Sequence, residues 1–442
     1  CTKTNMTEEK EINQLPKDWK WVKLGEVANY LNGRAFKPTE WKDEGKPIIR
    51  IQNLNKPSAN YNYTKEQFEE RYKVVKGDLL FAWSASLGAY IWKGDDAWLN
   101  QHIFKVVPKD FTDKRYLFYL LEKIVQELYA KAHGSGMVHV TKGKFEATDI
   151  PLPPKPTQLV IVSKIEELFS EIENGIKSLF TAKEQLKKYR QSVLKWAFEG
   201  KLSESGFTKL KDEQDSVNKK ILQSSNSENP DSDKGKLPEG WKWVMLGEVI
   251  EKPKYGTSKK CDYASNGIGV LRIPNIVKGM VDSSDLKFAQ FDAQEMETYG
   301  LKEGDILIIR SNGSVDIVGK CALVRKIDEQ FLFAGYLIRL RAIQKLLLPK
   351  YLANIFSSVN IRNQIEEKAK STSGVNNINS QELAGLIIPL PSIQQQQKII
   401  EAIESRLSVA DKMEESIAES LQQAESLKQS ILKKAFEGKL II

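Results

Sequence analysis

The chain has 442 residues, enough for two or three domains, and its 41% hydrophobic and 28% charged residues are typical of a soluble globular protein. No apolar stretch approaches the ~20 residues of a membrane span, and the polar, acidic N-terminal region is unlike a signal peptide. The net charge of +8 weakly favours a polyanionic partner, and three widely spaced cysteines exclude a disulfide framework and a zinc knuckle, so we expect a reduced, cytoplasmic setting.

An internal repeat organises the chain, because four motifs occur twice in the same order. They are Leu-Pro-x-x-Trp-x-Trp-x-x-Leu-Gly-Glu-Val at 15–27 and 237–249, Gly-Asp-Leu/Ile-Leu at 77–80 and 304–307, Ile-Pro-Leu-Pro at 150–153 and 388–391, and Ala-Phe-Glu-Gly-Lys-Leu at 197–202 and 435–440. The shared order indicates tandem duplication rather than chance similarity. Most of the basic excess lies in the first part of each copy.

Each copy begins with a mixed domain, at 1–157 and at 237–391. Short β-type runs alternate there with turns rich in Gly, Asn and Ser, and one helix is predicted near the end of each domain, at 115–132 and 349–370. The Pro-Leu-Pro segment ends the regular structure of each domain.

A long helical run follows each domain, at 158–202 and at 392–442, and each run ends at a Gly stop signal. Apolar residues recur in both runs with the 4-3 spacing of a heptad, which is typical of a coiled coil. The alternative to a coiled coil is that each helix is buried separately in its own globular core. Residues 203–236 are rich in Ser, Asn, Asp and Lys and are predicted to be a polar linker.

Connectivity predicts how the two helices pair. The first helix delivers the chain to the second domain, and the second helix starts there, so the simplest pairing is antiparallel. About 40 residues at 1.5 Å each give a rod of about 60 Å. We therefore predict an α+β chain with two mixed α/β domains at opposite ends of a long antiparallel two-helix coiled coil, with internal pseudo-twofold symmetry.

Catalytic signatures are missing from the sequence. There is no phosphate-binding loop, no Asn/Asp-Pro-Pro-Tyr-like tetrapeptide for amino-methyl transfer, and no His/Cys spacing for a metal. Glu366-Glu367-Lys368 could imitate a nuclease motif, but a solvated helix face explains it better. We predict a binding protein with no catalytic residues, no metal and no cofactor of its own.

Two similar basic domains suggest a two-headed DNA-binding protein, since Asn, Gln, Ser, Thr, Arg and Lys side chains suit base edges and phosphates. In the first domain the candidates are Asn32, Arg34, Arg50, Asn53, Ser84, Ser86, Gln101, His102, His133, Ser135, Lys142 and Lys144. In the second they are Tyr255, Thr257, Lys259, Lys260, Arg272, Asn275, Arg310, Asn312, Ser371, Ser373, Asn376 and Asn377. Trp19, Trp21, Trp241 and Trp243 could stack on flipped bases, but the apolar alternation around them favours a strand packed on a core.

The four duplicated motifs resemble those of the specificity subunit of type I restriction-modification systems, over nearly the whole chain. The resemblance implies two target-recognition domains that recognise the halves of a split, asymmetric double-stranded DNA sequence, with the helices as spacer. It also implies two methylation subunits, which bring S-adenosylmethionine and methylate adenine, and motor-nuclease subunits, which bring ATP, Mg²⁺ and cleavage.

Two other classes of function remain open. A DNA-modifying enzyme in its own right would show methyl transfer by the isolated chain. A coiled-coil scaffold that binds protein alone would have an affinity for duplex DNA that depends little on the DNA sequence.

Overall fold

The computed structural model describes residues 15–56, 58–84, 86–131, 141–202, 237–264, 266–369 and 375–440. The predicted linker at 203–236 lies outside these residues. The chain divides into two compact units, one formed by 1–180 with 417–442 and the other by 181–416. Each unit therefore holds one mixed domain and a half of each long helix. No helix among the described residues is long and apolar enough to cross a membrane.

The first unit contains two four-stranded sheets and a short two-stranded one. Its strands are β1 (Lys20–Lys23), β2 (Ala28–Asn32), β3 (Lys46–Ile49), β4 (Asn62–Thr64), β5 (Lys73–Val74), β6 (Leu79–Ala82), β7 (Gly88–Ile91), β8 (Ala97–Leu99), β9 (Ile103–Pro108) and β10 (Asp149–Leu152). Its helices are α1 (Leu24–Val27), α2 (Ile51–Asn55), α3 (Lys114–Lys131), α4 (Lys142–Glu146) and the first part of α5 (Lys155–Phe198). Strand β6 is buried at every position, as expected for the centre of a covered sheet.

The second unit repeats this plan around a six-stranded sheet in the order β12-β21-β17-β19-β15-β14. Its strands are β11 (Lys242–Met245), β12 (Lys254–Tyr255), β13 (Ile268–Leu271), β14 (Ile276–Val277), β15 (Gly279–Val281), β16 (Lys287–Ala289), β17 (Ile306–Ile309), β18 (Ser311–Asn312), β19 (Cys321–Leu323), β20 (Leu332–Phe333), β21 (Leu337–Leu340), β22 (Asn376–Asn377) and β23 (Ile387–Leu390). Its helices are α7 (Ala293–Tyr299), α8 (Pro349–Phe356), α9 (Val359–Lys368), α10 (Ser380–Ala384) and the first part of α11 (Ile393–Phe436).

The helical stretch predicted at 349–370 is helical in the structure, but it is not continuous. It is broken between α8 and α9, because Ser358 leaves the helical conformation and its hydroxyl accepts a hydrogen bond from the Ile361 amide as the N-cap of α9. The corresponding helix of the first domain, α3, runs without interruption over nearly the predicted range.

The tryptophan prediction is half wrong. Trp19 and Trp241 pack against the cores of their units, as predicted. Trp21 and Trp243, however, are 50% and 42% exposed. They lie on β1 and β11, each of which pairs with a single partner strand, β10 or β23, so that one face of the ribbon is left uncovered.

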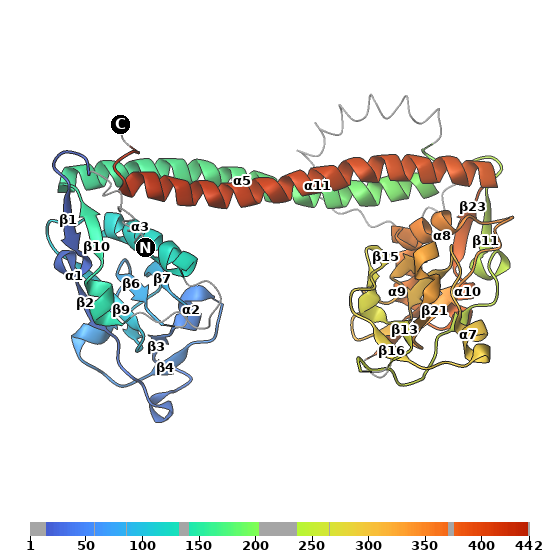
Figure 1. Cartoon of the computed structure of the whole chain (residues 1–442), viewed down its shortest axis with the longest axis horizontal. Helices are drawn as coiled ribbons and strands as arrows, with labels where there is room; N and C mark the ends of the chain where they lie inside the picture. Colours follow the sequence, from blue (N-terminus) through green and yellow to red (C-terminus); the bar gives the residue numbers. More distant parts are fainter. Residues whose placement is uncertain are drawn as a thin grey trace, which may run out of the picture. The chain divides into compact units, whose positions relative to one another are not determined.

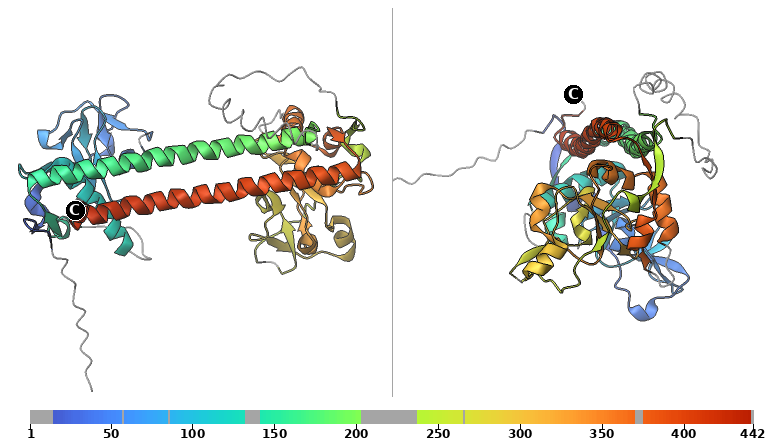
Figure 2. Two further views of the ribbon diagram at one scale, coloured as in Figure 1. Left: turned by 90° about the horizontal axis from the view of Figure 1, so that it is seen from above. Right: turned by 90° about the vertical axis from the view of Figure 1, so that its right-hand side faces the viewer.

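Long helices α5 and α11 pair in antiparallel fashion within each unit (Figure 2). In the first unit Lys428 contacts Glu173, with 3.4 Å between Nζ and Oε1. Ile431, near the end of α11, belongs to the same buried core as Ile161 and Ile165 of α5. In the second unit Arg190 bridges Asp411 and Glu414 at 2.6 and 3.1 Å. The seam residues predicted by the 4-3 spacing are buried or half-buried, except Lys183, which is exposed. They are Ile165, Phe169, Ile172, Ile176, Leu179, Lys183, Leu186, Arg190, Val193 and Ala197 in α5, and Ile403, Leu407, Ala410, Glu414, Ile417, Leu421, Ala424, Lys428, Ile431 and Ala435 in α11.

A buried glutamine fastens the start of each long helix to its domain. The Gln158 side chain accepts a hydrogen bond from the Asp113 amide at 2.7 Å and donates to the carbonyls of Phe111 and Pro153 at 3.0 and 2.9 Å. Gln396 makes the same three bonds in the second unit, from the Leu348 amide at 2.8 Å and to the carbonyls of Leu346 and Pro391 at 2.9 and 3.0 Å. Both side chains are fully buried.

Replacing Gln396 with Ala is expected to destabilise the second unit. Three hydrogen bonds are lost and the buried Pro391 carbonyl keeps no partner, which costs about 2–4 kcal/mol in the free energy of unfolding. Urea unfolding followed by circular dichroism measures this loss. Gln394→Ala, at an exposed position two residues earlier, is the matched control. Equal stability of the two variants would contradict the fastening role.

Candidate nucleic-acid interface

Strands β2, β9 and β6 are neighbours in one sheet of the first unit (Figure 1). Polar and aromatic side chains gather where β2 and β6 end and β9 begins. The indole Nε1 of Trp83 donates a hydrogen bond to Oδ1 of Asn32 at 3.3 Å. The Trp83 ring lies 4.9 Å from the His102 ring and 5.6 Å from the Phe104 ring, between centroids. His102 has a positive φ of 70°, a conformation that is costly for a side chain with a Cβ and is concentrated at functional sites.

A lysine from α4 joins this cluster. The Lys142 Nζ donates a hydrogen bond to the Tyr30 carbonyl at 2.9 Å and lies 6.0 Å from the centroid of the Phe104 ring. Lys142 is exposed, and its Nζ also lies 3.6 Å from Oε1 of Glu146. Gln101, which precedes His102, and Lys144 are exposed as well. The cluster therefore combines a positive charge, an amide and an aromatic face, which are the groups that bind phosphates and bases.

In the second unit, the equivalent position carries an arginine on an aromatic ring. The guanidinium of Arg310 lies 4.9 Å from the centre of the Tyr255 ring, and its Nε donates to Oδ1 of Asn377 at 3.3 Å. The Tyr255 hydroxyl in turn accepts a hydrogen bond from the Ser380 amide at 3.0 Å. These contacts hold the arginine beside the short ladder in which Asn312 pairs with Asn376.

Strand register shows which residues of the two units correspond. Phe104 pairs with both Asn32 and Phe81, and Ile338 pairs with both Tyr255 and Ile308. Asn32 therefore corresponds to Tyr255. The residues after β6 and β17, Trp83 and Arg310, also correspond, since their amides donate to the carbonyls of His102 at 3.1 Å and Tyr336 at 3.0 Å. His102 thus matches Tyr336, which is 62% exposed.

Two predicted asparagines do not lie at the surface, so they leave the candidate set. Asn53 and Asn275 are 2% and 1% exposed. Each accepts a hydrogen bond from the amide three residues before it, Arg50 at 3.1 Å and Arg272 at 2.8 Å, and so caps a short helical turn. Thr257 is also buried and its hydroxyl accepts from the Lys259 amide at 3.0 Å.

Several predicted basic residues are already engaged within the chain. Arg34 donates to both oxygens of Glu40, at 2.9 and 2.6 Å, and these bonds together with the Lys37 amide lower the pKa of Glu40 to about 2. Arg272 pairs with Asp285 at 3.2 Å. The Arg50 guanidinium lies 5.6 Å from the centre of the Trp41 ring. The ion pairs of Arg34 and Arg272 favour a role in holding loops in place over direct contact with bases.

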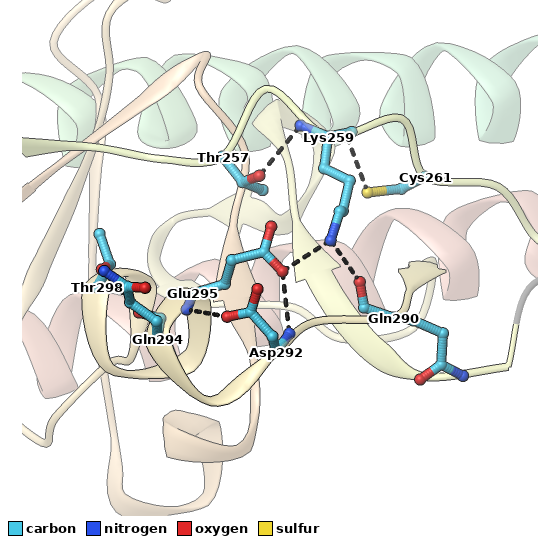
Figure 3. Close-up of polar contacts among 8 residues, drawn as sticks. All are labelled: Thr257, Lys259, Cys261, Gln290, Asp292, Gln294, Glu295 and Thr298. Atoms are coloured by element: carbon cyan, nitrogen blue, oxygen red, sulfur yellow. Dashed lines mark hydrogen bonds and ion pairs between the residues drawn. The ribbon is translucent and has the colours of Figure 1, made fainter.

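Lys259 is engaged in the same way (Figure 3). Its Nζ donates to Oε2 of Glu295 at 2.7 Å and to the Gln290 carbonyl at 2.8 Å. The bond from Lys259 and one from the Asp292 amide lower the pKa of Glu295. Lys259 therefore ties its loop to the first turn of α7. Lys259 and Lys260 are both exposed.

Four candidates, His133, Ser135, Ser371 and Ser373, lie outside the described residues. Ser84 and Ser86 are half-buried in the turn after β6, where the Ser86 amide donates to the Ser84 carbonyl at 2.6 Å. Sequence reasoning missed Trp83 and Tyr336. The repeat itself held a signal for Trp83, because aligning Gly77-Asp78 with Gly304-Asp305 places it opposite Arg310.

Within the described part of the chain, no three or more His, Cys, Asp or Glu side chains lie together as metal ligands would. Cys321 is buried, which raises its pKa to about 12 and keeps the thiol protonated. The side chains gathered at the two clusters are suited to binding rather than to bond chemistry.

Comparison with known proteins agrees with this geometry. The family model for the type I restriction modification DNA specificity domain matches residues 16–181 and again 238–423. The chain is 28% identical to the EcoBI specificity subunit of Escherichia coli, over 96% of this chain and 86% of that protein. It is 26% identical to the EcoKI specificity subunit of Escherichia coli strain K12, over 97% and 90%.

Two solved structures share the fold. A chain from a structural study of the assembly and conformational transition of the type I restriction-modification system is similar with a TM-score of 0.69 and 20% identity, covering 96% of this chain and 99% of that one. The HsdS subunit from Thermoanaerobacter tengcongensis is similar with a TM-score of 0.52 and 20% identity, covering 96% and 98%.

Proposed function

Because this chain belongs to the type I restriction-modification DNA specificity family, as a non-catalytic subunit that recognises DNA sequence, we propose that its target is bipartite and asymmetric. Each mixed domain would recognise one half of the target through the cluster described above. The long helices would separate the two halves by an unrecognised gap.

One observation carries this proposal: the two clusters share a framework but differ in the side chains they present. Asn53 and Asn275 accept equivalent capping hydrogen bonds in the two units. Gln158 and Gln396 likewise make equivalent hydrogen bonds. At the corresponding exposed or half-buried positions, Asn32 is replaced by Tyr255, Trp83 by Arg310 and His102 by Tyr336. Two domains that present different side chains on the same framework are suited to recognise different base sequences.

We further propose that two methylation subunits dock on this chain and supply S-adenosylmethionine and the adenine-methylating site. The duplicated exposed strands support a pair of equivalent docking surfaces, since Trp21 and Trp243 stand at matching positions of β1 and β11. Motor-nuclease subunits would add ATP, Mg²⁺ and cleavage. The complex would act on DNA in the cytoplasm.

The isolated chain is expected to bind DNA weakly and to show no methylation, cleavage or ATP hydrolysis. Adding the methylation subunits is expected to give specific binding and adenine methylation, because they extend the phosphate contacts and bring the methyl donor. Gel-shift and methyl-transfer assays on the chain alone and on the complex measure both effects. Methyl transfer by the chain alone would instead support an enzyme.

A footprint separates this proposal from a scaffold that binds protein alone. Two protected segments of different sequence with an unprotected gap are expected for the complex. Binding that is independent of DNA sequence, at any salt concentration, would favour the scaffold.

A further inference from the structure

We propose that Arg310 recognises a guanine in the half-site bound by residues 237–391, through its two terminal guanidinium nitrogens. This inference rests on the proposed function and adds one base to it.

The contacts of Arg310 fix the guanidinium and leave its outer edge open. The Arg310 Cζ lies over the Tyr255 ring, 4.9 Å from its centre, and Asn377 accepts a hydrogen bond from Nε at 3.3 Å. Among the described residues, neither terminal nitrogen has a hydrogen-bond partner and no carboxylate lies within ion-pair distance. An arginine that is oriented in advance loses less rotamer freedom on binding.

The other arginines of this domain are committed elsewhere. Arg339 is buried, and the rest make ion pairs or hydrogen bonds with residues of their own domain: Arg272 with Asp285, Arg325 with Asp328, Arg341 with Asp305, and Arg362 with Glu366 and the Val318 carbonyl. Among the described residues of this domain, Arg310 is therefore the arginine whose terminal nitrogens remain available to a ligand.

Guanine is the base that this edge fits best. In the major groove it presents two acceptors, O6 and N7, at the spacing of the two terminal nitrogens, whereas adenine presents one acceptor and one donor. A phosphate would also accept from the guanidinium, but it would carry no sequence information. The two possibilities differ in their dependence on DNA sequence.

Binding by the full chain in complex with the methylation subunits, on a duplex library randomised in this half-site, tests the inference. The wild-type complex is expected to require guanine at one position. Arg310→Ala and Arg310→Lys are both expected to lose that requirement and to raise the dissociation constant for the target about 10- to 100-fold, since lysine keeps the charge but not the planar fork. Trp83→Ala, the matched change in the first domain, should leave this half-site unchanged.

Base analogues locate the contact. Replacing the required guanine with 7-deazaguanine, which lacks N7, should weaken the wild-type complex but have little further effect on Arg310→Ala. Inosine, which keeps O6 and N7, should bind the wild type as guanine does. Melting curves of the free variants confirm that both remain folded.

Three results would overturn the inference while leaving the proposed function in place: no guanine requirement in this half-site, an unchanged requirement in both Arg310 variants, or equal weakening on every sequence. Absence of any sequence preference in the wild-type complex would remove the proposed function and this inference together.

Discussion

Replacing residues 237–391 with the equivalent block of a relative that recognises another sequence is expected to change one half of the DNA target and leave the other half intact. The two ends of this block lie side by side, because β11 and β23 pair along their length with Lys242 opposite Leu390. It also holds a core of its own around Leu307 and Phe333. Affinity for the original target should fall about 10³-fold or more, the scale that separates specific from non-specific binding.

Sequencing of methylated adenines in cells that carry the hybrid gives the new target directly. The reciprocal replacement of 1–157 is the control and should alter the other half alone. A hybrid in which both halves change would contradict independent recognition by the two domains. Retention of the original target would contradict recognition by this block.

Removing one heptad from each long helix, residues 183–189 together with 421–427, is expected to shorten the unrecognised gap by about two or three base pairs. Seven helical residues span about 10.5 Å at 1.5 Å each, and B-DNA rises about 3.4 Å per base pair. The deletion keeps both seams in register because the 4-3 pattern resumes with the same layers facing inward. Neither cluster of candidate residues is changed, so both half-sites should keep their sequences.

The competing hypothesis is that the linker at 203–236 sets the gap. It predicts no change from the heptad deletion and a large change from a shorter linker. Mapping methylated adenines for both variants decides between them. A deletion of two residues from each helix is the matched control: it turns the seam residues on either side of the deletion by about 200° relative to one another, so it should abolish specific binding rather than shorten the gap.

Local patterns in the sequence were sufficient for the repeat, the long helices and their seam. A heptad is a property of spacing alone, so Ile165, Val193, Ile403 and Ile431 could be assigned to the seam without knowing what they touch, and all four are buried. The C-terminal ends of both long helices could also be predicted from the sequence, because each is followed by a glycine. Gly200 and Gly438 have φ of +71° and +73°, which glycine adopts without strain.

Tertiary structure decided which polar residues can meet DNA, because composition does not distinguish an exposed side chain from a buried cap. Asn53 and Asn275 look like base-contacting residues in the sequence, yet their hydrogen bonds hold a turn. Arg34 looks like a free cation, yet Glu40 and the Phe68 ring, 4.3 Å from its guanidinium, enclose it.

The composition of each cluster also depended on strand register. Asn32, Trp83 and His102 are far apart in the chain and meet because β2 and β6 both pair with β9. The same pairing with β21 brings Tyr255 beside Arg310. The duplicated motifs alone determined that two equivalent domains exist, whereas long-range hydrogen bonds between strands determined which side chains each domain presents together.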